Sequence, residues 1–113
     1  MRSRRQGARA VAHGDVFQAI SDPTRRRLVE RLSRSELSVN ALARPFRMSR
    51  PAISQHLRVL RRAGLVRVRR AGRERYYRLY VLPLRRVHDW VSHYERFWKD
   101  KLTALGKYLE ETP

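Results

Sequence analysis

Apolar residues recur at three- and four-residue steps through the first half of the chain, which is the spacing of one face of a helix. Val16, Phe17 and Ile20 predict a short helix over 15–20. A second helix is predicted over 23–33, because Asp22 is a favourable N-cap and Pro23 suits the first helical position. On this second helix we expect buried Leu28, Val29 and Leu32 and solvent-facing Arg25, Arg26, Arg27 and Arg31.

Two further helices follow in close succession, and each begins after a serine. Ser38 is predicted to cap a helix over 39–46, and Ser49 a helix that continues to 62. The link at 47–49 is short, so we expect the two helices to cross steeply, as in a helix-turn-helix. The side chains predicted to be buried on these two helices are Leu42, Phe46, Ile53, Leu57 and Leu60.

Polar and apolar residues alternate from 65 to 70, and a second such run follows from 75 to 80. This is the period of a β-strand. Ala63 and Gly64 end the preceding helix, because glycine readily adopts the left-handed conformation that closes helices. A turn at 71–74 joins the two strands. The pattern therefore predicts a β-hairpin, the wing of a winged helix-turn-helix.

Pro83 opens the last predicted element, a single long helix of about seven turns. Its apolar stripe consists of Leu84, Val87, Trp90, Val91, Tyr94, Phe97, Trp98, Leu102, Leu105, Tyr108 and Leu109. A single small domain cannot cover so long a stripe, so we expect this helix to pair with that of a second copy. The predicted dimer interface is Trp90, Tyr94, Phe97, Trp98, Leu102 and Leu105.

These elements predict a mainly α fold with a small β-hairpin, a winged helix-turn-helix with a long C-terminal dimerisation helix. We divide the chain into a basic disordered arm (1–14), a winged helix-turn-helix DNA-binding domain (15–82) and a C-terminal dimerisation helix (83–113). The arm contains four arginines and no acidic residue. We expect it to be a passive tail, with a DNA minor-groove contact as the alternative.

Positive charge is concentrated in the middle of the chain. The formal net charge is +17, and the segment 47–80 contributes 11 basic residues against 1 acidic residue. Such clustering indicates a polyanionic partner and not merely a solvated surface. DNA is favoured over an anionic membrane, because no helix pairs a strongly basic face with a compact apolar one. Cysteine is absent, and no apolar run is long enough to span a membrane. We expect a cytosolic protein.

Three stretches occur in the order and spacing of a known family. They are Ala19–Leu28, Ser54–Leu60 with the following 63–66, and Gly72–Leu79. Across about 15–82 the sequence resembles the ArsR family of bacterial winged helix repressors. The resemblance implies a homodimer that binds imperfect inverted repeats in double-stranded DNA and represses transcription until an inducer releases it.

The metal sites of this family are not reproduced. Its best-known sensors carry a Cys-x-Cys motif after Glu-Leu, and Ser38 and Asn40 stand at those positions here. Oxygen and amide groups do not replace thiolates for arsenic, cadmium or lead. A second family site uses Asp and His on the dimer helices, but His88 and His93 do not share one helix face. We expect no metal and no other cofactor. A small-molecule inducer between the paired helices remains open, beside the plain interface that an aromatic stripe usually marks.

DNA contacts are predicted on the helix after Ser49 and on the wing. In the major groove, Gln55 suits an adenine edge, and Arg50 or Arg58 suits guanine. His56 is near the DNA face by resemblance, although its place before Leu57 also favours a structural role against the core. The predicted recognition-helix contacts are Ser49, Arg50, Ser54, Gln55, His56 and Arg58, and the predicted wing contacts, on the outer face and tip of the hairpin, are Arg67, Arg69, Arg73 and Arg75.

The predicted function is sequence-specific transcriptional regulation by a homodimeric repressor. A non-specific architectural DNA-binding protein is the main alternative, and polar base readers such as Gln55 and Ser54 argue against it. A protein-interaction module that works through the aromatic helix would leave the basic wing unexplained. Catalysis is not expected, because the four histidines are scattered at 13, 56, 88 and 93, without a nucleophile and base at meaningful spacing.

Overall fold

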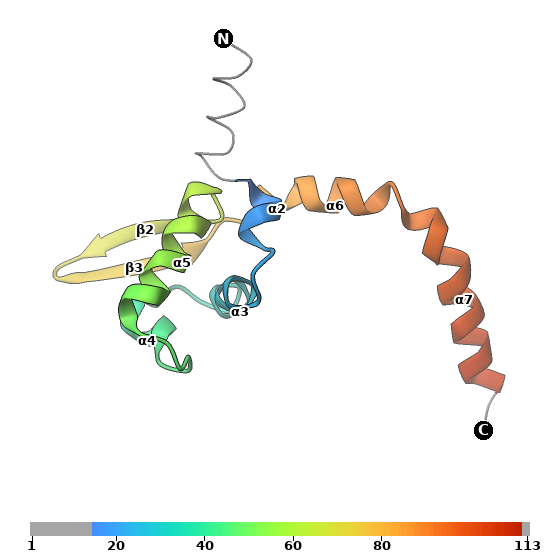
Figure 1. The fold of residues 1–113 in the computed structure, drawn as a ribbon, viewed down its shortest axis with the longest axis horizontal. Helices are drawn as coiled ribbons and strands as arrows, with labels where there is room; N and C mark the ends of the chain where they lie inside the picture. The colour runs from blue at the N-terminus through green and yellow to red at the C-terminus, as the bar shows by residue number, and fades with distance from the viewer. Residues whose placement is uncertain (1–14, 112–113) are drawn as a thin grey trace, which may run out of the picture.

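A computed structural model describes residues 15–111 as a small helical domain with a three-stranded sheet and a projecting C-terminal arm (Figure 1). The predicted arm at 1–14 lies outside the described residues. The helices are α2 (Val16–Ala19), α3 (Pro23–Leu32), α4 (Val39–Ala43), α5 (Arg50–Arg62), α6 (Leu84–Ser92) and α7 (Glu95–Glu111), and the strands are β1 (Leu37–Ser38), β2 (Val66–Ala71) and β3 (Glu74–Leu79). The fold is the predicted one, mainly α with a β-hairpin wing.

Side-chain caps begin the first four helices. Asp22 Oδ2 accepts a hydrogen bond from the backbone N–H of Arg25 at 3.0 Å, and Pro23 occupies the first turn of α3. Ser38 and Ser49 cap α4 and α5 in the same way, and Asp15 caps α2. These oxygens satisfy backbone donors that the first turn of a helix leaves unpaired. The caps predicted at Asp22, Ser38 and Ser49 are therefore confirmed.

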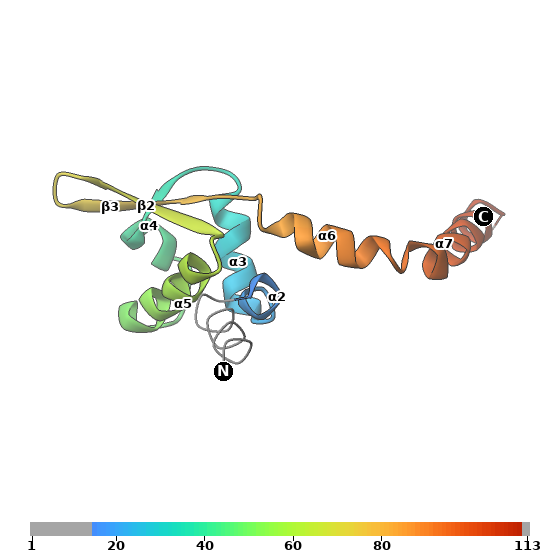
Figure 2. The same ribbon diagram turned by 90° about the horizontal axis from the view of Figure 1, so that it is seen from above.

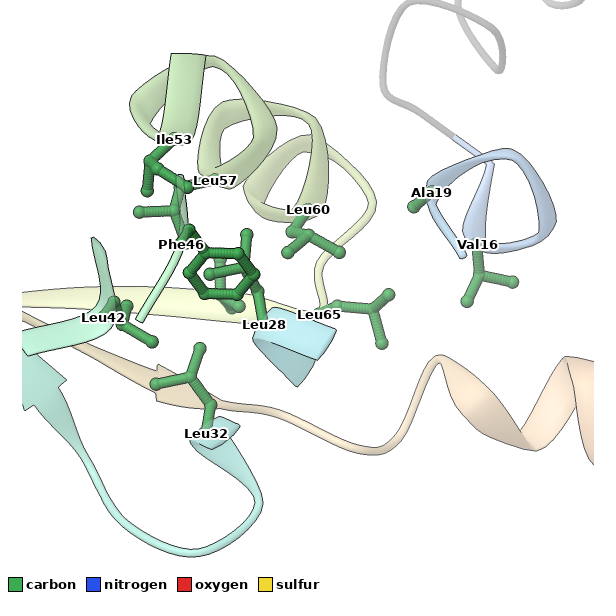
Figure 3. Packing of buried hydrophobic residues seen from close by; sticks show 11 residues of the cluster. Val16, Ala19, Leu28, Leu32, Leu42, Phe46, Ile53, Leu57, Leu60 and Leu65 are labelled. Atoms are coloured by element: carbon green, nitrogen blue, oxygen red, sulfur yellow. The ribbon is translucent and has the colours of Figure 1, made fainter. Parts of the chain in front are cut away.

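The core lies where α2, α3, α4 and α5 meet the base of the wing (Figure 3). All of the predicted core side chains of α3, α4 and α5 are buried except Val29, which is half-buried. Phe46 is buried, although α4 ends at Ala43, three residues before the predicted end. The buried side chains are Val16, Ala19, Leu28, Leu32, Leu42, Phe46, Ile53, Leu57, Leu60, Leu65 and Val66.

The end of α5 is joined directly to the wing. Gly64 has a φ of 80°, and its N–H donates to the carbonyl of Arg61 at 3.0 Å. The N–H of Leu65 donates to the carbonyl of Leu60 at 3.0 Å, which completes a Schellman motif. The N–H of Tyr80 then donates to the carbonyl of Leu65 at 2.8 Å. The recognition helix and the base of the hairpin therefore form one connected unit.

The sheet contains a strand that the hydrophobic pattern does not predict. Its order is β1-β3-β2, and all pairings are antiparallel. β1 has only two residues, Leu37 and Ser38, which pair with Tyr77 and Tyr76. Two residues are too few to show alternation in sequence. β1 nevertheless fixes the start of α4 against the central strand, because Ser38 is also the α4 cap.

Two arginines that were predicted to face solvent are half-buried. Arg25 donates from Nε to the carbonyl of Ala19 at 2.7 Å and from Nη2 to that of Gln18 at 3.2 Å. Arg31 donates from Nη2 to the carbonyl of Ala41 at 3.0 Å. Backbone carbonyls near helix ends need donors, and long arginine side chains supply them here. The prediction was wrong for these two residues and correct for the other two arginines of α3.

The single C-terminal helix predicted from Pro83 is two helices, α6 and α7, separated by a turn at 93–94. Ser92 Oγ donates to the carbonyl of His88 at 2.8 Å, and His93 Nδ1 lies 3.1 Å from the carbonyl oxygen of Asp89. Side chains that bond carbonyls one turn back compete with the backbone ladder and bend helices. Both bonds lie at the break, which contains neither glycine nor proline.

The C-terminal arm, defined as α6 and α7, projects from the opposite end of the domain to the wing tip (Figures 1 and 2). Leu84 and Val87 pack against the core, whereas α7 extends beyond it. The radius of gyration is 18.4 Å. A compact domain of this length would have a value of about 13 Å. The arm therefore presents its surface away from the domain.

Candidate nucleic-acid interface

The outward face of α5 carries the polar side chains that were predicted to contact bases. Because the apolar stripe of this helix faces the core, Arg50, Gln55 and Arg58 are exposed. Arg58 Nη1 donates to Gln55 Oε1 at 2.7 Å. Ser54 is half-buried and lies on the flank of α5 that faces the wing. Gln55 and Arg58 are therefore a bonded pair on the outermost line of α5, and Ser54 is a short polar side chain beside the wing.

A hollowed, basic surface lies between α5 and the wing. Its two adjoining parts, of about 160 and 310 Å³, share Ser54, Arg75 and Tyr77. The remaining lining residues are Leu57, Arg58 and Arg61 in one part, and Val39, Asn40, Arg50, Arg73 and Glu74 in the other. Five arginines and one glutamate give this groove a strongly positive potential, which suits a phosphate backbone.

The wing divides its arginines between two faces. Residues directly opposite each other in an antiparallel pair share a face. Arg69 pairs with Tyr76, whereas Arg70 pairs with Arg75. Arg67 and Arg69 therefore lie on one face, and Arg75 lies on the other, toward α5. The prediction of a shared outer face was wrong for Arg75.

Arg67 and Arg69, on the face of the wing away from α5, already have partners within the protein. Arg69 makes a bidentate contact with Glu36, with Nη2 to Oε1 at 2.5 Å and Nε to Oε2 at 3.3 Å. This hydrogen bond from Arg69 is the main reason that the pKa of Glu36 lies below its usual range. The guanidinium of Arg69 also lies over the ring of Tyr76, and that of Arg67 lies 3.7 Å from the ring centroid of Tyr80. Glu36 thus balances one positive charge on this face, and both guanidinium groups are held by contacts within the protein.

His56 belongs to a contact between the recognition helix and the start of α3. Its side chain is only 18% exposed, and Nδ1 lies 3.2 Å from Arg25 Nη1 and 3.9 Å from Asp22 Oδ2. Because a guanidinium can only donate, Nδ1 accepts this bond, and Nε2 carries the ring proton. The arrangement matches the structural role that was the alternative for this histidine.

Asp22 is held ionised by the same cluster. Burial by itself would raise the pKa of its carboxyl. The hydrogen bond from the backbone N–H of Arg25 is the largest influence that lowers the pKa, and the net result in this cluster is a pKa below the ordinary value. The ionised carboxylate is the stronger cap for α3. The N-terminus of α3 and the middle of α5 are therefore joined through charged groups.

Two arginines that were not predicted lie beside the predicted site. Arg61 lines the groove with Arg58 and Arg75, and Arg70 shares the wing face of Arg75. Arg61 stands two turns after Ser54, so the helical period would have placed it on the same flank. The wing face of Arg70 follows only from the strand register, which depends on the turn at Gly72 (φ 63°).

The C-terminal arm exposes a continuous aromatic and aliphatic stripe. Trp90, Tyr94 and Phe97 form a chain of rings, with centroid separations of 5.3 and 6.1 Å, that crosses the break between α6 and α7. Phe17 of α2 extends this chain toward the domain, 5.9 Å from Trp90. All six residues predicted for the dimer interface are at least 40% exposed. Exposed apolar stripes of this extent are typical of binding surfaces.

The histidines of the arm form a different pattern from the family's metal site. His88 Nδ1 lies 3.3 Å from Asp89 Oδ1, and His93 turns back to the α6 backbone. Across residues 15–111, no three His, Asp or Glu side chains are grouped as a metal ion would require. Among the helices of the same residues, none is long and apolar enough to cross a membrane.

Comparison with known proteins agrees with this geometry. A helix-turn-helix domain family model matches residues 20–69. The HTH-type transcriptional regulator Rv2034 of Mycobacterium tuberculosis is 43% identical over 95 residues, covering 84% of this chain and 86% of that protein. The transcriptional repressor SdpR of Bacillus subtilis is 35% identical, covering 71% of this chain and 89% of that protein.

The folds agree as well. An ArsR-like transcriptional regulator from Rhodococcus sp. RHA1 superposes with a TM-score of 0.66 at 33% identity, covering 87% of this chain and 90% of that chain. The chain belongs to the ArsR family of winged helix-turn-helix transcriptional regulators, which bind specific DNA sequences.

Proposed function

We propose that the protein is a homodimeric repressor that reads an inverted-repeat operator with α5 and holds the flanking backbone with its wing. The observation that carries this proposal is the groove between α5 and the wing. Polar side chains at the outermost line of α5 suit base edges in the major groove. The arginines beside them suit phosphates. The proposed α5 contacts are Ser49, Arg50, Ser54, Gln55 and Arg58, and the proposed backbone contacts are Arg61, Arg70, Arg73 and Arg75.

The wing face away from α5 takes a smaller part in this proposal. Arg67 and Arg69 are packed on tyrosines, and Arg69 is paired with Glu36. Breaking a bidentate pair to reach phosphate would offset much of the gain. We expect these two arginines to contribute less to affinity than Arg73 and Arg75.

Dimerisation through the arm is supported by the exposed stripe. Two-fold pairing would cover the stripe on both copies at once. It would also present two copies of α5 to one face of the duplex, about one helical turn apart. The operator would accordingly contain two half-sites related by two-fold symmetry. A repressor function agrees with the name of the Bacillus subtilis relative.

The test is selection of binding sites from a random duplex library, followed by fluorescence anisotropy with the recovered duplex and a scrambled control. We expect an inverted repeat that binds about 10³-fold or more tighter than the control. Titrations at two salt concentrations separate base reading from phosphate attraction. Equal binding to both duplexes with a steep salt dependence would instead establish an architectural DNA-binding protein.

A further inference from the structure

Gln55 and Arg58 are joined on the outermost line of the recognition helix. Both side chains are exposed, and Arg58 Nη1 donates to Gln55 Oε1 at 2.7 Å. The two residues are three apart, so their side chains are neighbours on one helix face. A guanidinium has donors and no acceptor. The carbonyl oxygen of Gln55, not its amide nitrogen, must therefore face Arg58.

No acidic side chain lines the part of the groove next to Arg58, so no carboxylate there competes with Gln55 for this arginine. The part of the groove that Arg58 lines also contains Arg61 and Arg75 and holds no acidic side chain. Repulsion between guanidinium groups disfavours movement of Arg58 toward the wing. The carboxamide of Gln55 is the neutral acceptor on the opposite side. The pairing is therefore favoured by charge as well as by helical spacing.

The pairing changes which base Gln55 can recognise. A free glutamine reads adenine by donating to N7 and accepting from the N6 amino group. Here Arg58 occupies one of the two lone pairs of the accepting oxygen. The Gln55 amide N–H bonds and the remaining N–H bonds of Arg58 therefore outnumber the one acceptor position that is left. Guanine offers two adjacent acceptors, O6 and N7, in the major groove.

We propose that Gln55 and Arg58 act as one donor unit that selects guanine, instead of adenine, at the base pair read by Gln55. This inference rests on the proposed function, because it requires α5 to enter the major groove. Residues three apart are separated by about 4.5 Å along the helix axis. This is comparable to the rise of about 3.4 Å between base pairs. The two side chains are therefore close enough to reach one base pair and its neighbour.

The experiment repeats the site selection with four forms of the full chain: wild type, Gln55→Ala, Arg58→Ala and Arg62→Ala. Gln55→Ala identifies the base pair that Gln55 reads, because this variant should lose the base preference at that one position of the selected site. Arg62→Ala is the matched control, an exposed arginine on the same helix without a bond to Gln55. All three substituted side chains are exposed, and unchanged thermal unfolding would show that each variant is folded.

Two duplexes are then compared that differ only in having guanine or adenine at that position. We expect the wild type and Arg62→Ala to bind the duplex with guanine at least about tenfold tighter. Arg58→Ala frees the carbonyl oxygen of Gln55, so its preference should reverse to adenine. An adenine preference in the wild type, guanine retained by Arg58→Ala, or no base preference lost in Gln55→Ala would each overturn the inference. Failure of the wild type to select any inverted repeat would overturn the proposed function itself.

Discussion

Arg25 joins three helices through one side chain. Its guanidinium donates to the carbonyls of Ala19 and Gln18 and lies 3.2 Å from His56 Nδ1. Arg25→Met keeps much of the side-chain length but removes the donors, which leaves half-buried acceptors unpaired. We expect the free energy of unfolding, measured by urea denaturation, to fall by about 1–3 kcal/mol. Arg34→Met removes the same charge from an exposed position near the end of α3 and should have little effect. Equal losses in the two variants would contradict the structural role of Arg25.

At the scale of elements, the pair between Glu36 and Arg69 joins the segment before β1 to β2, across the central strand. The hydrogen bond from Arg69 lowers the pKa of Glu36 below its ordinary value of 4.5. A lowered pKa in the folded state stabilises the fold above the pKa of the unfolded chain, and this contribution is lost as pH falls through the folded-state pKa. The wild type should therefore be more stable than Glu36→Gln near pH 7, and the difference should disappear as pH falls below the folded-state pKa of Glu36.

Urea denaturation of both proteins across this pH range measures that difference directly. Glu30→Gln provides the control, because Glu30 is exposed on α3. A difference between the wild type and Glu36→Gln that stays constant with pH would show that ionisation of Glu36 is not the source of the stabilisation.

Elements with local signals could be predicted from sequence, and those that depend on distant contacts could not. The caps at Asp22 and Ser49 and the buried stripe of α5 follow from spacing alone. β1 was not predicted, because its two residues form a strand only by pairing with β3. Pairing across the hairpin likewise fixes the wing face of Arg75. The break in the C-terminal arm, where Ser92 and His93 bond to the backbone, has no glycine or proline to announce it in the sequence. The polar face of α5 was visible in the sequence, but the partner of each wing arginine was not.

For the whole molecule, the decisive surface is the stripe along the C-terminal arm. Phe97 is 60% exposed and Trp98 is 40% exposed, although both are large and apolar. If two copies bury this stripe together, Trp98→Arg or Phe97→Glu would place a charge in the interface. We expect each substitution to raise the dimer dissociation constant by at least about 30-fold, the equivalent of about 2 kcal/mol. Light scattering coupled to size exclusion measures this constant over a dilution series.

The same substitutions should weaken operator binding, although they lie far from α5 in the chain. A monomer can occupy only one half-site, so it loses the contacts of the second recognition helix. Thr103→Arg is the matched control for Trp98→Arg, because Thr103 is exposed on the opposite face of α7. It should leave both dimerisation and operator binding unchanged. A Trp98→Arg protein that remains a dimer with full operator affinity would show that the stripe serves another partner. Parallel loss of both properties would show that DNA recognition depends on pairing of the arms.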